Sequence, residues 1–473
     1  MNNKCQVFTP QNYASILLDK IKYNNFLYGK KILENSCGDG NILLKVVERY
    51  IIDSMSRDFS LLKIKKGLEC DIYGIEIDPV QYRKCLDNLN KLTSTYGIYD
   101  IKWSIINADY LKKDLKITFD FIVGNPPYIA YKEIDKEERK EIRNRFNSCS
   151  IGKFDYCYAF IEKSLDELSK NGKLSYIVPL SIFKTKFGIR IRELIKKNLV
   201  EIVDYKNEIM FPGKTVKSAI IIVDKNVNKE SFIYHISNKK QYHLIIKKKD
   251  LSDKWLFNKN KNRGNKRFGD FFRVSHAPVT MLNKAYVIDL ERCKKQKEHY
   301  IVDDVYCLEN ALVKHAIAPK NMNKNKKEVI IFPYYIKNDE VLSFNETEFI
   351  DNYPGVEKYL NRFKKELNSR SIEKKTQWFE YGRSQALQIV IQKKIVMSTI
   401  ISNRVKARIF SKNVVPYSGI LIVKKKNNNT ISIDEALSVL RSEEFLEYCY
   451  NIGIPINGHS IRVSSKDIEN YHF

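Results

Sequence analysis

The chain has few features of a secreted, membrane-bound or zinc-binding protein. Its nine cysteines are an odd number, widely scattered and without a Cys-x-x-Cys pair. That usage is typical of free thiols in a reducing cytosol rather than of disulfides or a zinc site. Met1–Pro10 lacks the apolar core of a signal peptide, and no apolar run approaches the roughly 20 residues of a membrane span. We therefore expect a cytoplasmic protein with no metal and no membrane partner.

Acidic residues are outnumbered by basic ones. The 473 residues include 56 Asp and Glu against 82 Lys and Arg, which gives a net charge of +26. One explanation is a lysine-rich surface that reflects codon usage, since Asn and Ile are also frequent. The other is a polyanionic partner, because lysines that neutralise phosphates release condensed counterions.

Internal repeats are also missing, and the length predicts more than one domain. From Lys31 to about Asp224, short apolar runs alternate with helical stretches, a pattern typical of βαβ units around a parallel sheet. Expected strands are Ile32–Leu33, Ile72–Ile75, Trp103–Ile106, Phe119–Val123, Lys173–Val178, Glu201–Tyr205 and Ala219–Val223, the last two as an antiparallel edge hairpin. Expected helices begin at Asn41 and Pro79 or span Phe160–Leu168 and Arg190–Lys197.

The alternation ends in a polar, Lys/Asn-rich stretch. Lys259–Lys266 has the composition of a linker. Beyond it we expect an irregular α+β domain with helices at Val356–Leu367 and Ile433–Cys449. The predicted domains are therefore residues 1–265 and 266–473.

Candidate ligand-binding residues follow three successive strands of the predicted sheet. Gly38 and Gly40 allow a tight turn with backbone close to a ligand. Glu76 ends the next strand, where an acid can bind the ribose hydroxyls of a nucleoside. Asp78 precedes Pro79 and is interpreted as a helix cap. Asp109 follows the third strand, where a polar group would reach an adenine ring.

The catalytic candidate is Asn125-Pro126-Pro127-Tyr128, directly after an apolar strand. The exocyclic amine of adenine is a poor nucleophile because its lone pair is delocalised into the ring. The Asn125 side-chain oxygen and the next backbone carbonyl can accept its hydrogens and aim the lone pair at a methyl donor. The prolines stiffen the loop, and the Tyr128 ring can stack on the base.

These motifs together resemble the gamma-class (Taq-type) N6-adenine DNA methyltransferases over the whole first half. The resemblance implies a Rossmann-like, SAM-dependent methyltransferase sheet with S-adenosylmethionine (SAM) as cofactor. It also implies a SAM pocket lined by Thr9, Glu34, Gly38, Glu76 and Asp109. Tyr128 and Phe211 would enclose a flipped adenine. Two positions depart from the family pattern: Asn35 replaces a proline or small residue, and Phe154-Asp155-Tyr156 matches only loosely and receives no catalytic role.

The second half resembles the target-recognition domain of such enzymes. Phe268–Phe272 matches its opening, and Trp378–Gln385 recurs in relatives with this domain. Arg383 and Gln385 suit contacts to base edges or phosphates. Arg404, Lys406 and Arg408 alternate with apolar residues and would share one strand face. Plain solvent exposure is the competing explanation for all five side chains.

The sequence therefore predicts a monomeric adenine-N6 methyltransferase acting on double-stranded DNA, in restriction-modification or epigenetic regulation. A cognate restriction endonuclease would be its partner in the first case. A fused nuclease is not expected, because the motifs start at Phe8 and no acid-lysine cluster follows. The alternatives are an RNA methyltransferase, a protein-glutamine methyltransferase, and a DNA-specificity subunit with a vestigial SAM fold.

Overall fold

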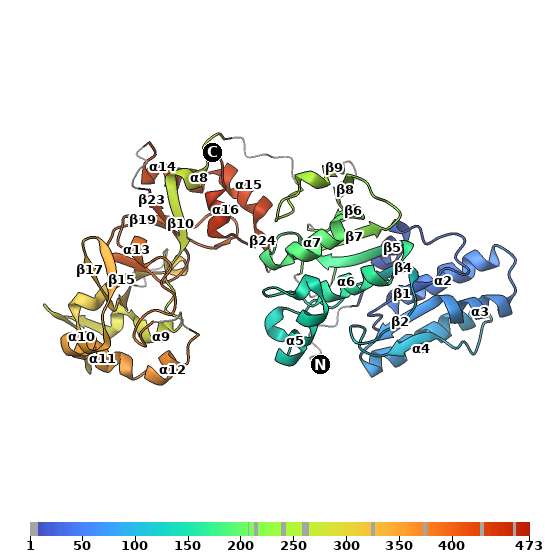
Figure 1. The fold of residues 1–473 in the computed structure, drawn as a ribbon, viewed down its shortest axis with the longest axis horizontal. Helices are drawn as coiled ribbons and strands as arrows, with labels where there is room; N and C mark the ends of the chain where they lie inside the picture. The colour runs from blue at the N-terminus through green and yellow to red at the C-terminus, as the bar shows by residue number, and fades with distance from the viewer. Residues whose placement is uncertain are drawn as a thin grey trace. The chain divides into compact units, whose positions relative to one another are not determined.

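The computed structural model describes residues 8–206, 208–211, 216–237, 243–257, 264–322, 327–371, 376–425, 430–456 and 460–473. The chain divides into two compact units, Met1–Phe257 and Asn258–Phe473 (Figure 1). Residues 259–263 of the expected linker lie outside the described residues.

The first unit is built on one mixed sheet. Its strands are β1 (Ile32–Glu34), β2 (Ile72–Glu76), β3 (Ser104–Asn107), β4 (Phe119–Gly124), β5 (Leu168–Pro179), β6 (Leu199–Asp204), β7 (Ser218–Asp224), β8 (Ser231–Ile236) and β9 (His243–Lys247). The strand order is β3-β2-β1-β4-β5-β7-β6-β8-β9, parallel from β3 through β5, and β7 is antiparallel to both its neighbours. The order reverses between β1 and β4, and ligands of open α/β sheets bind at the carboxyl ends of strands beside such a switch point.

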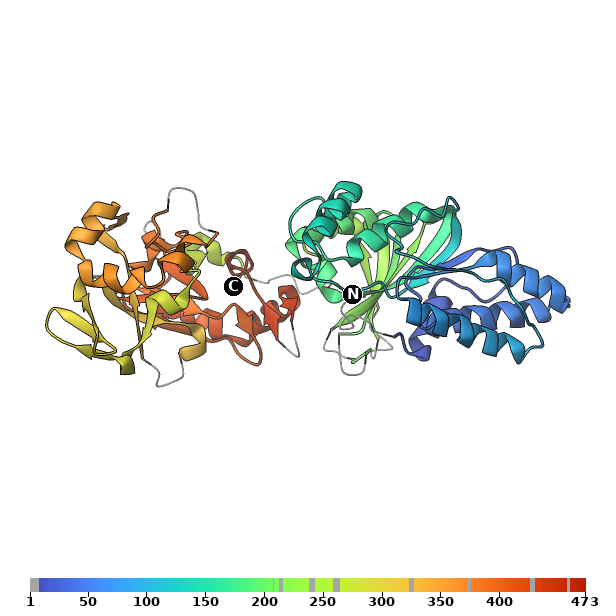
Figure 2. The same cartoon turned by 90° about the horizontal axis from the view of Figure 1, so that it is seen from below.

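Helices cover both faces of this sheet (Figure 2). They are α1 (Gln11–Lys20), α2 (Asn41–Met55), α3 (Leu61–Asp71), α4 (Pro79–Ser94), α5 (Lys136–Arg145), α6 (Cys157–Glu167) and α7 (Ile189–Lys196). In β5, Tyr176 and Val178 pack in one core with α6 and α7, whereas Ile177 packs in the other with α1 and α2. Because neighbouring strand residues point to opposite faces, this division shows a sheet that is buried on both sides.

The expected alternation of strands and helices between residues 31 and 224 is confirmed. The Asp78 cap is confirmed as well, since its carboxylate accepts hydrogen bonds from the N–H groups of Val80 and Gln81. The expected edge hairpin is wrong in one respect. β6 and β7 do pair antiparallel, but β7 lies between β5 and β6, and β8 and β9 extend the sheet beyond them.

The second unit has several small sheets and short helices, as the α+β prediction requires. One sheet holds β10 (Phe272–His276), β23 (Ile420–Lys424), β19 (Lys394–Met397) and β21 (Ala407–Phe410), and another holds β11 (Val287–Asp289), β16 (Glu328–Ile331), β15 (Val313–Ile317) and β22 (Val414–Pro416). Smaller sheets contain β12 (Cys293–Lys295), β13 (His299–Val302), β14 (Tyr306–Glu309), β17 (Tyr334–Lys337), β18 (Glu340–Ser343), β20 (Ile400–Ile401), β24 (Ile454–Pro455) and β25 (Ile461–Arg462). The helices are α8 (Phe268–Phe271), α9 (Asn283–Tyr286), α10 (Glu346–Asn352), α11 (Pro354–Asn361), α12 (Lys364–Asn368), α13 (Leu387–Val390), α14 (Ile433–Arg441), α15 (Glu443–Ile452) and α16 (Ser465–Glu469).

Both long helices expected in the second unit are broken in two. Val356–Leu367 is divided between α11 and α12, and Ile433–Cys449 between α14 and α15. Ser442 caps α15 by accepting a hydrogen bond from the N–H of Phe445, which separates this helix from α14. Among the described residues no helix is both long and apolar enough to cross a membrane, and the cysteines there are all free.

Candidate active site

The loop after β1 is the first element of the site. Gly38 and Gly40 have φ of +55° and +91°, which side chains other than glycine rarely adopt. A Cβ atom on Gly40 would lie 2.8 Å from Cys85 Sγ of α4, so the loop also needs the space that glycine leaves. The Cys37 N–H donates to the Ile75 carbonyl at 3.0 Å, which ties the loop to β2. The Phe8 ring packs beside Gly38.

Glu76 is fixed at the end of β2 by two backbone groups. Its two carboxylate oxygens accept hydrogen bonds from the N–H groups of Gly38 and Asp78, both at 2.8 Å. The side chain is buried, and burial raises the pKa of its carboxyl group. Each carboxylate oxygen has lone pairs beyond the one engaged here, so Glu76 can still accept hydrogen bonds from a ribose.

Glu34 supplies a second observation that a cofactor belongs here. Its side chain is 3% exposed, and Oε2 has no hydrogen-bond partner among the described residues. Burial raises the pKa of this carboxyl group well above its usual range. Buried polar atoms are rarely left without a partner, so an uncompensated oxygen beside the glycine loop fits a cationic or hydrogen-donating ligand.

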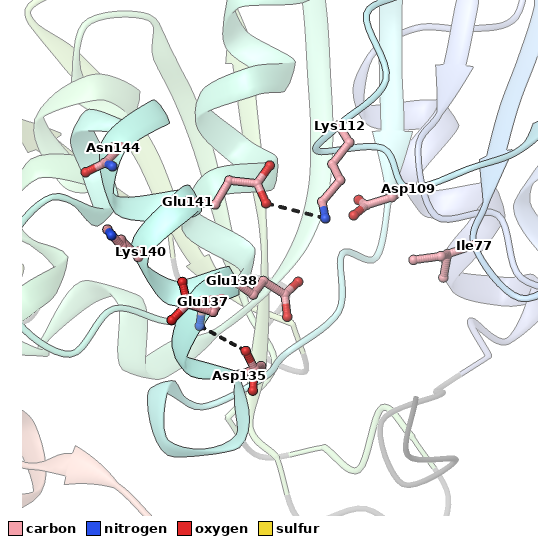
Figure 3. A pocket seen from close by; sticks show the side chains of 9 residues that line it. All are labelled: Ile77, Asp109, Lys112, Asp135, Glu137, Glu138, Lys140, Glu141 and Asn144. Atoms are coloured by element: carbon pink, nitrogen blue, oxygen red, sulfur yellow. Dashed lines mark hydrogen bonds and ion pairs between the residues drawn. The ribbon is translucent and has the colours of Figure 1, made fainter.

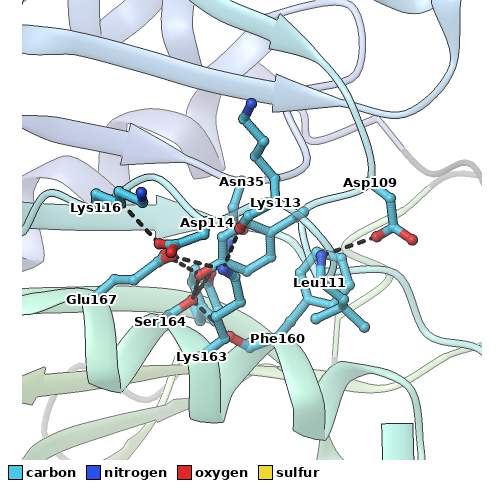
Figure 4. Close-up of polar contacts among 12 residues, drawn as sticks. Asn35, Asp109, Leu111, Lys113, Asp114, Lys116, Phe160, Lys163, Ser164 and Glu167 are labelled. Atoms are coloured by element: carbon cyan, nitrogen blue, oxygen red, sulfur yellow. Dashed lines mark hydrogen bonds and ion pairs between the residues drawn. The ribbon is translucent and has the colours of Figure 1, made fainter. Parts of the chain in front are cut away.

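Asp109 completes this edge of the sheet. The Asn107 side chain donates to the carbonyls of Glu76 and Ile77, which holds the ends of β2 and β3 together. One Asp109 oxygen accepts the Leu111 N–H at 2.9 Å (Figure 4). Thr9 is buried at 5% exposure.

A cavity of about 740 Å³ opens beside Asp109 (Figure 3). It is lined by Ile77, Asp109, Lys112, Asp135, Glu137, Glu138, Lys140, Glu141 and Asn144. Figure 3 shows Glu138 and Glu141 of α5 turned toward Lys112 and Asp109. Carboxylates outnumber the two lysines on this lining, which suits a cofactor with net positive charge.

The Asn125–Tyr128 segment follows β4, next to the glycine loop. Ser36 Oγ donates to the Asn125 carbonyl at 3.3 Å, so the predicted cofactor and catalytic loops are joined directly. Tyr128 is half-buried, and its hydroxyl faces Ser218 at the start of β7. Burial raises the pKa of this hydroxyl well above its usual range, so it remains protonated.

Asn35 belongs to a buried polar network that is centred on Ser164 (Figure 4). Its amide donates to Ser164 Oγ of α6 at 2.9 Å. Ser164 also lies 3.1 Å from the Tyr110 hydroxyl and 2.7 Å from the Tyr176 hydroxyl. This network explains the departure from the family pattern at Asn35, because a proline there could not donate a hydrogen bond to Ser164.

Asp155 lies beside the chain that leaves the catalytic loop. It forms a backbone bridge with Ala130, and the Tyr156 N–H donates to the Ile129 carbonyl at 3.1 Å. Its carboxylate accepts the Cys157 N–H at the start of α6. Burial raises the pKa of Asp155 to about 6.

The remaining predicted residues are not gathered into this site. Phe211 is 3% exposed and packs in the core with Tyr205 and Ile220, so its stacking role stays a prediction. In the second unit, Arg383 and Gln385 are exposed. The predicted alternation also holds: the exposed side chains are Arg404, Lys406 and Arg408, and the buried ones are Val405 and Ala407. Arg408 donates to the Met322 carbonyl, which occupies part of its guanidinium.

Sequence reasoning missed the residues that hold the loops together. Ser36 stood next to the glycine loop without a role, and Ser164 lies 129 residues from Asn35. The one signal in the sequence was Asn35, a polar residue at a loop position where the family pattern has a proline or small residue.

The strand order is that of the SAM-dependent methyltransferase fold, and this fold implies SAM as cofactor. Residues 49–211 match the family described as Eco57I restriction-modification methylase. This segment is therefore similar to the Eco57I-type restriction-modification methylases.

Relatives of known function agree with this assignment. The chain is 25% identical over 380 residues to the type II restriction enzyme and methyltransferase RM.Eco57I of Escherichia coli, covering 71% of this chain and 38% of that protein. It is 30% identical over 273 residues to the type II methyltransferase M.BstVI of Geobacillus stearothermophilus, covering 52% and 48%. The chain thus spans less than half the length of both relatives.

Solved structures show the same fold over nearly the whole chain. The type IIL restriction-modification enzyme MmeI, in complex with DNA, superposes with a TM-score of 0.62 at 13% identity, covering 97% of this chain and 65% of that one. DrdV, also in a DNA complex, gives 0.53 at 12% identity and covers 94% and 53%. Both units therefore have counterparts in these structures.

Proposed function

We propose that the protein methylates the N6 amine of adenine in double-stranded DNA, as the modification activity of a restriction-modification system. The observation that carries the proposal is the bond from Ser36 to Asn125, which places the Asn-Pro-Pro-Tyr segment against the glycine loop. An amine held by the Asn125–Tyr128 segment would meet a methyl donor held at the glycine loop.

In this proposal the residues act by positioning. Asn125 Oδ1 and the Pro126 carbonyl accept the two amine hydrogens, which directs the nitrogen lone pair away from the ring. SAM, when bound, supplies the methyl group as an electrophile attached to a sulfonium. Glu76 holds the ribose, and Glu34 accepts a hydrogen bond inside the pocket. After transfer the amine loses one hydrogen as a proton to solvent water, and no metal is needed.

A base inside a duplex must leave the stack to reach this loop, at a cost of a few kcal/mol. Tyr128 is half-buried at the loop and would stack on the extruded base. Phe211 would be the opposite ring, which requires it to move out of the packing that now buries it.

DNA is the substrate that the charge and the relatives favour. The net charge of +26 and the exposed Arg404, Lys406 and Arg408 suit a polyanion. RM.Eco57I is named as a restriction enzyme and methyltransferase, and MmeI was solved with DNA. We propose that the second unit selects the target site, that the enzyme acts as a monomer, and that a cognate endonuclease recognises the same site.

The test is a competition between substrate classes. Tritiated SAM is offered with duplex DNA, structured RNA and a glutamine-containing protein, and the labelled product is identified by mass spectrometry. We expect label in DNA as N6-methyladenine. Label in cytosine, in RNA or in the glutamine amide would contradict the proposal, and SAM binding without transfer to any substrate would support a vestigial fold.

A further inference from the structure

Helix α5 carries two faces of opposite charge. Lys136, Arg139, Lys140 and Arg143 recur at i, i+3, i+4 and i+7, which places them on one side of the helix. Figure 3 shows Lys140 on the side of α5 that faces away from Glu138 and Glu141.

The acidic face of α5 carries Glu138 and Glu141, and both side chains already have bonding partners. Glu138 accepts a hydrogen bond from the Tyr156 hydroxyl at 2.9 Å. Glu141 lies 3.4 Å from both Lys112 and Arg145. These bonds hold the acids toward the cofactor side, so they do not neutralise the basic stripe.

The basic stripe has no such compensation. Among the described residues no carboxylate lies within 4 Å of the charged nitrogens of its four members, whose side chains are exposed or half-exposed. The pKa of the Asp135 carboxyl is lowered, mainly by the hydrogen bond from the Glu137 N–H and to a smaller extent by the charge of Arg139. The Asp135 carboxylate is engaged as the cap of α5, because it accepts that Glu137 N–H.

An aromatic ring lies beneath the two arginines. The guanidinium carbons of Arg139 and Arg143 lie 4.5 and 5.5 Å from the centre of the Tyr131 ring. Arg143 donates to the Tyr131 hydroxyl and to the Gly152 carbonyl, and Arg139 donates to the Lys132 carbonyl. These contacts hold the guanidinium groups in place, and Nη1 of each arginine has no partner among the described residues.

The stripe lies close to the catalytic loop along the chain. Tyr131 is three residues after Tyr128, so their Cα atoms are within about 11 Å of each other. The bridge between Ala130 and Asp155 fixes this short connection. A DNA duplex carries one negative charge per roughly 1.7 Å of axis, so several phosphates would lie within that distance of a target base.

We propose that Lys136, Arg139, Lys140 and Arg143, ordered by Tyr131, form a phosphate-binding surface for the DNA strand that flanks the target base. The inference rests on the proposed function. It assigns part of the DNA binding to the catalytic unit, separately from site selection in the second unit.

The test uses the salt dependence of DNA binding by the full chain. Each phosphate contact contributes a slope of about −0.9 to a plot of log K against log salt concentration. Lys136→Gln/Lys140→Gln removes two charges and leaves the arginine contacts with Tyr131 intact. Between 50 and 200 mM salt, wild type should therefore lose about 12-fold more affinity than this variant.

The matched control is Lys66→Gln/Lys91→Gln, two exposed lysines on α3 and α4. It should keep the wild-type slope, and Arg139→Lys/Arg143→Lys should also keep it because the charges remain. Lys66→Gln/Lys91→Gln and Arg139→Lys/Arg143→Lys should bind SAM like wild type, because the side chains that they change do not line the cavity beside Asp109. An unchanged slope in the Lys136/Lys140 variant would overturn the inference, as would an equal reduction in the control.

Failure of the proposed function would look different. In that case wild-type protein itself would transfer no methyl group to DNA. Wild-type transfer combined with an unchanged slope refutes the phosphate surface alone.

Discussion

Asp155→Asn probes the packing beside the catalytic loop through its pH dependence. Burial raises the pKa of Asp155 to about 6, against roughly 3.9 for an unfolded chain. A raised carboxyl pKa means that the folded state favours the protonated form. Its stabilising contribution is complete below the unfolded pKa and is lost as the pH rises through the folded pKa. The difference of about 2 pKa units corresponds to roughly 3 kcal/mol in all, of which about 2 kcal/mol falls between pH 4.5 and 7.5.

Asparagine keeps an oxygen that can accept the Cys157 N–H but does not ionise. The variant should therefore gain about 2 kcal/mol relative to wild type when the pH is raised from 4.5 to 7.5. Urea unfolding of both proteins at the two pH values measures this difference. Exposed Asp87 gives a matched control in Asp87→Asn, which should change little. A pH-independent difference between wild type and Asp155→Asn would refute the reasoning.

Glu76→Gln should weaken SAM binding about 10- to 150-fold, since a hydrogen bond to a charged group is worth about 1.5–3 kcal/mol. Calorimetric titration measures this affinity, and an unchanged value would show that Glu76 does not bind the ribose. Ser164→Ala leaves the Asn35 amide without its acceptor and should lower the free energy of unfolding by about 1–3 kcal/mol in denaturant titrations. The half-exposed control Ser94→Ala should stay near wild type, and equal losses would show that the network is unimportant. Phe211→Leu keeps an apolar side chain in the core and should reduce turnover while changing the fluorescence of 2-aminopurine at the target position. Wild-type turnover and fluorescence would make Phe211 a packing residue.

The carboxyl edge of the sheet was predictable because its signals are local. Glu76 and Asn125 each follow an apolar run that forms the expected strand, and Gly40 and Asp78 begin the helices that follow. Backbone restrictions act within a few residues, so such patterns are readable from sequence. The order of these strands in the sheet then brings the three predicted loops together.

The missing parts depend on long-range pairing. β8 and β9 lie in a stretch whose many lysines and asparagines gave no clear strand signal, and they form because β6 offers an edge to pair with. The Asn35–Ser164 contact joins residues far apart in sequence. The sequence of α5 also does not show which side of the helix lines the cofactor cavity, so its separate acidic and basic sides become apparent only in the structure.

The most direct test of the central claim is single-molecule sequencing of DNA from cells that express the wild-type chain or Asn125→Ala and have no other adenine methyltransferase. Wild type should mark adenines within one recurring sequence as N6-methyladenine. Asn125→Ala should leave DNA unmarked while the purified variant still binds SAM, because Glu76 and the glycine loop remain. Unmodified adenine in wild-type cells with active, SAM-loaded protein, or equal marking by Asn125→Ala, would contradict the account.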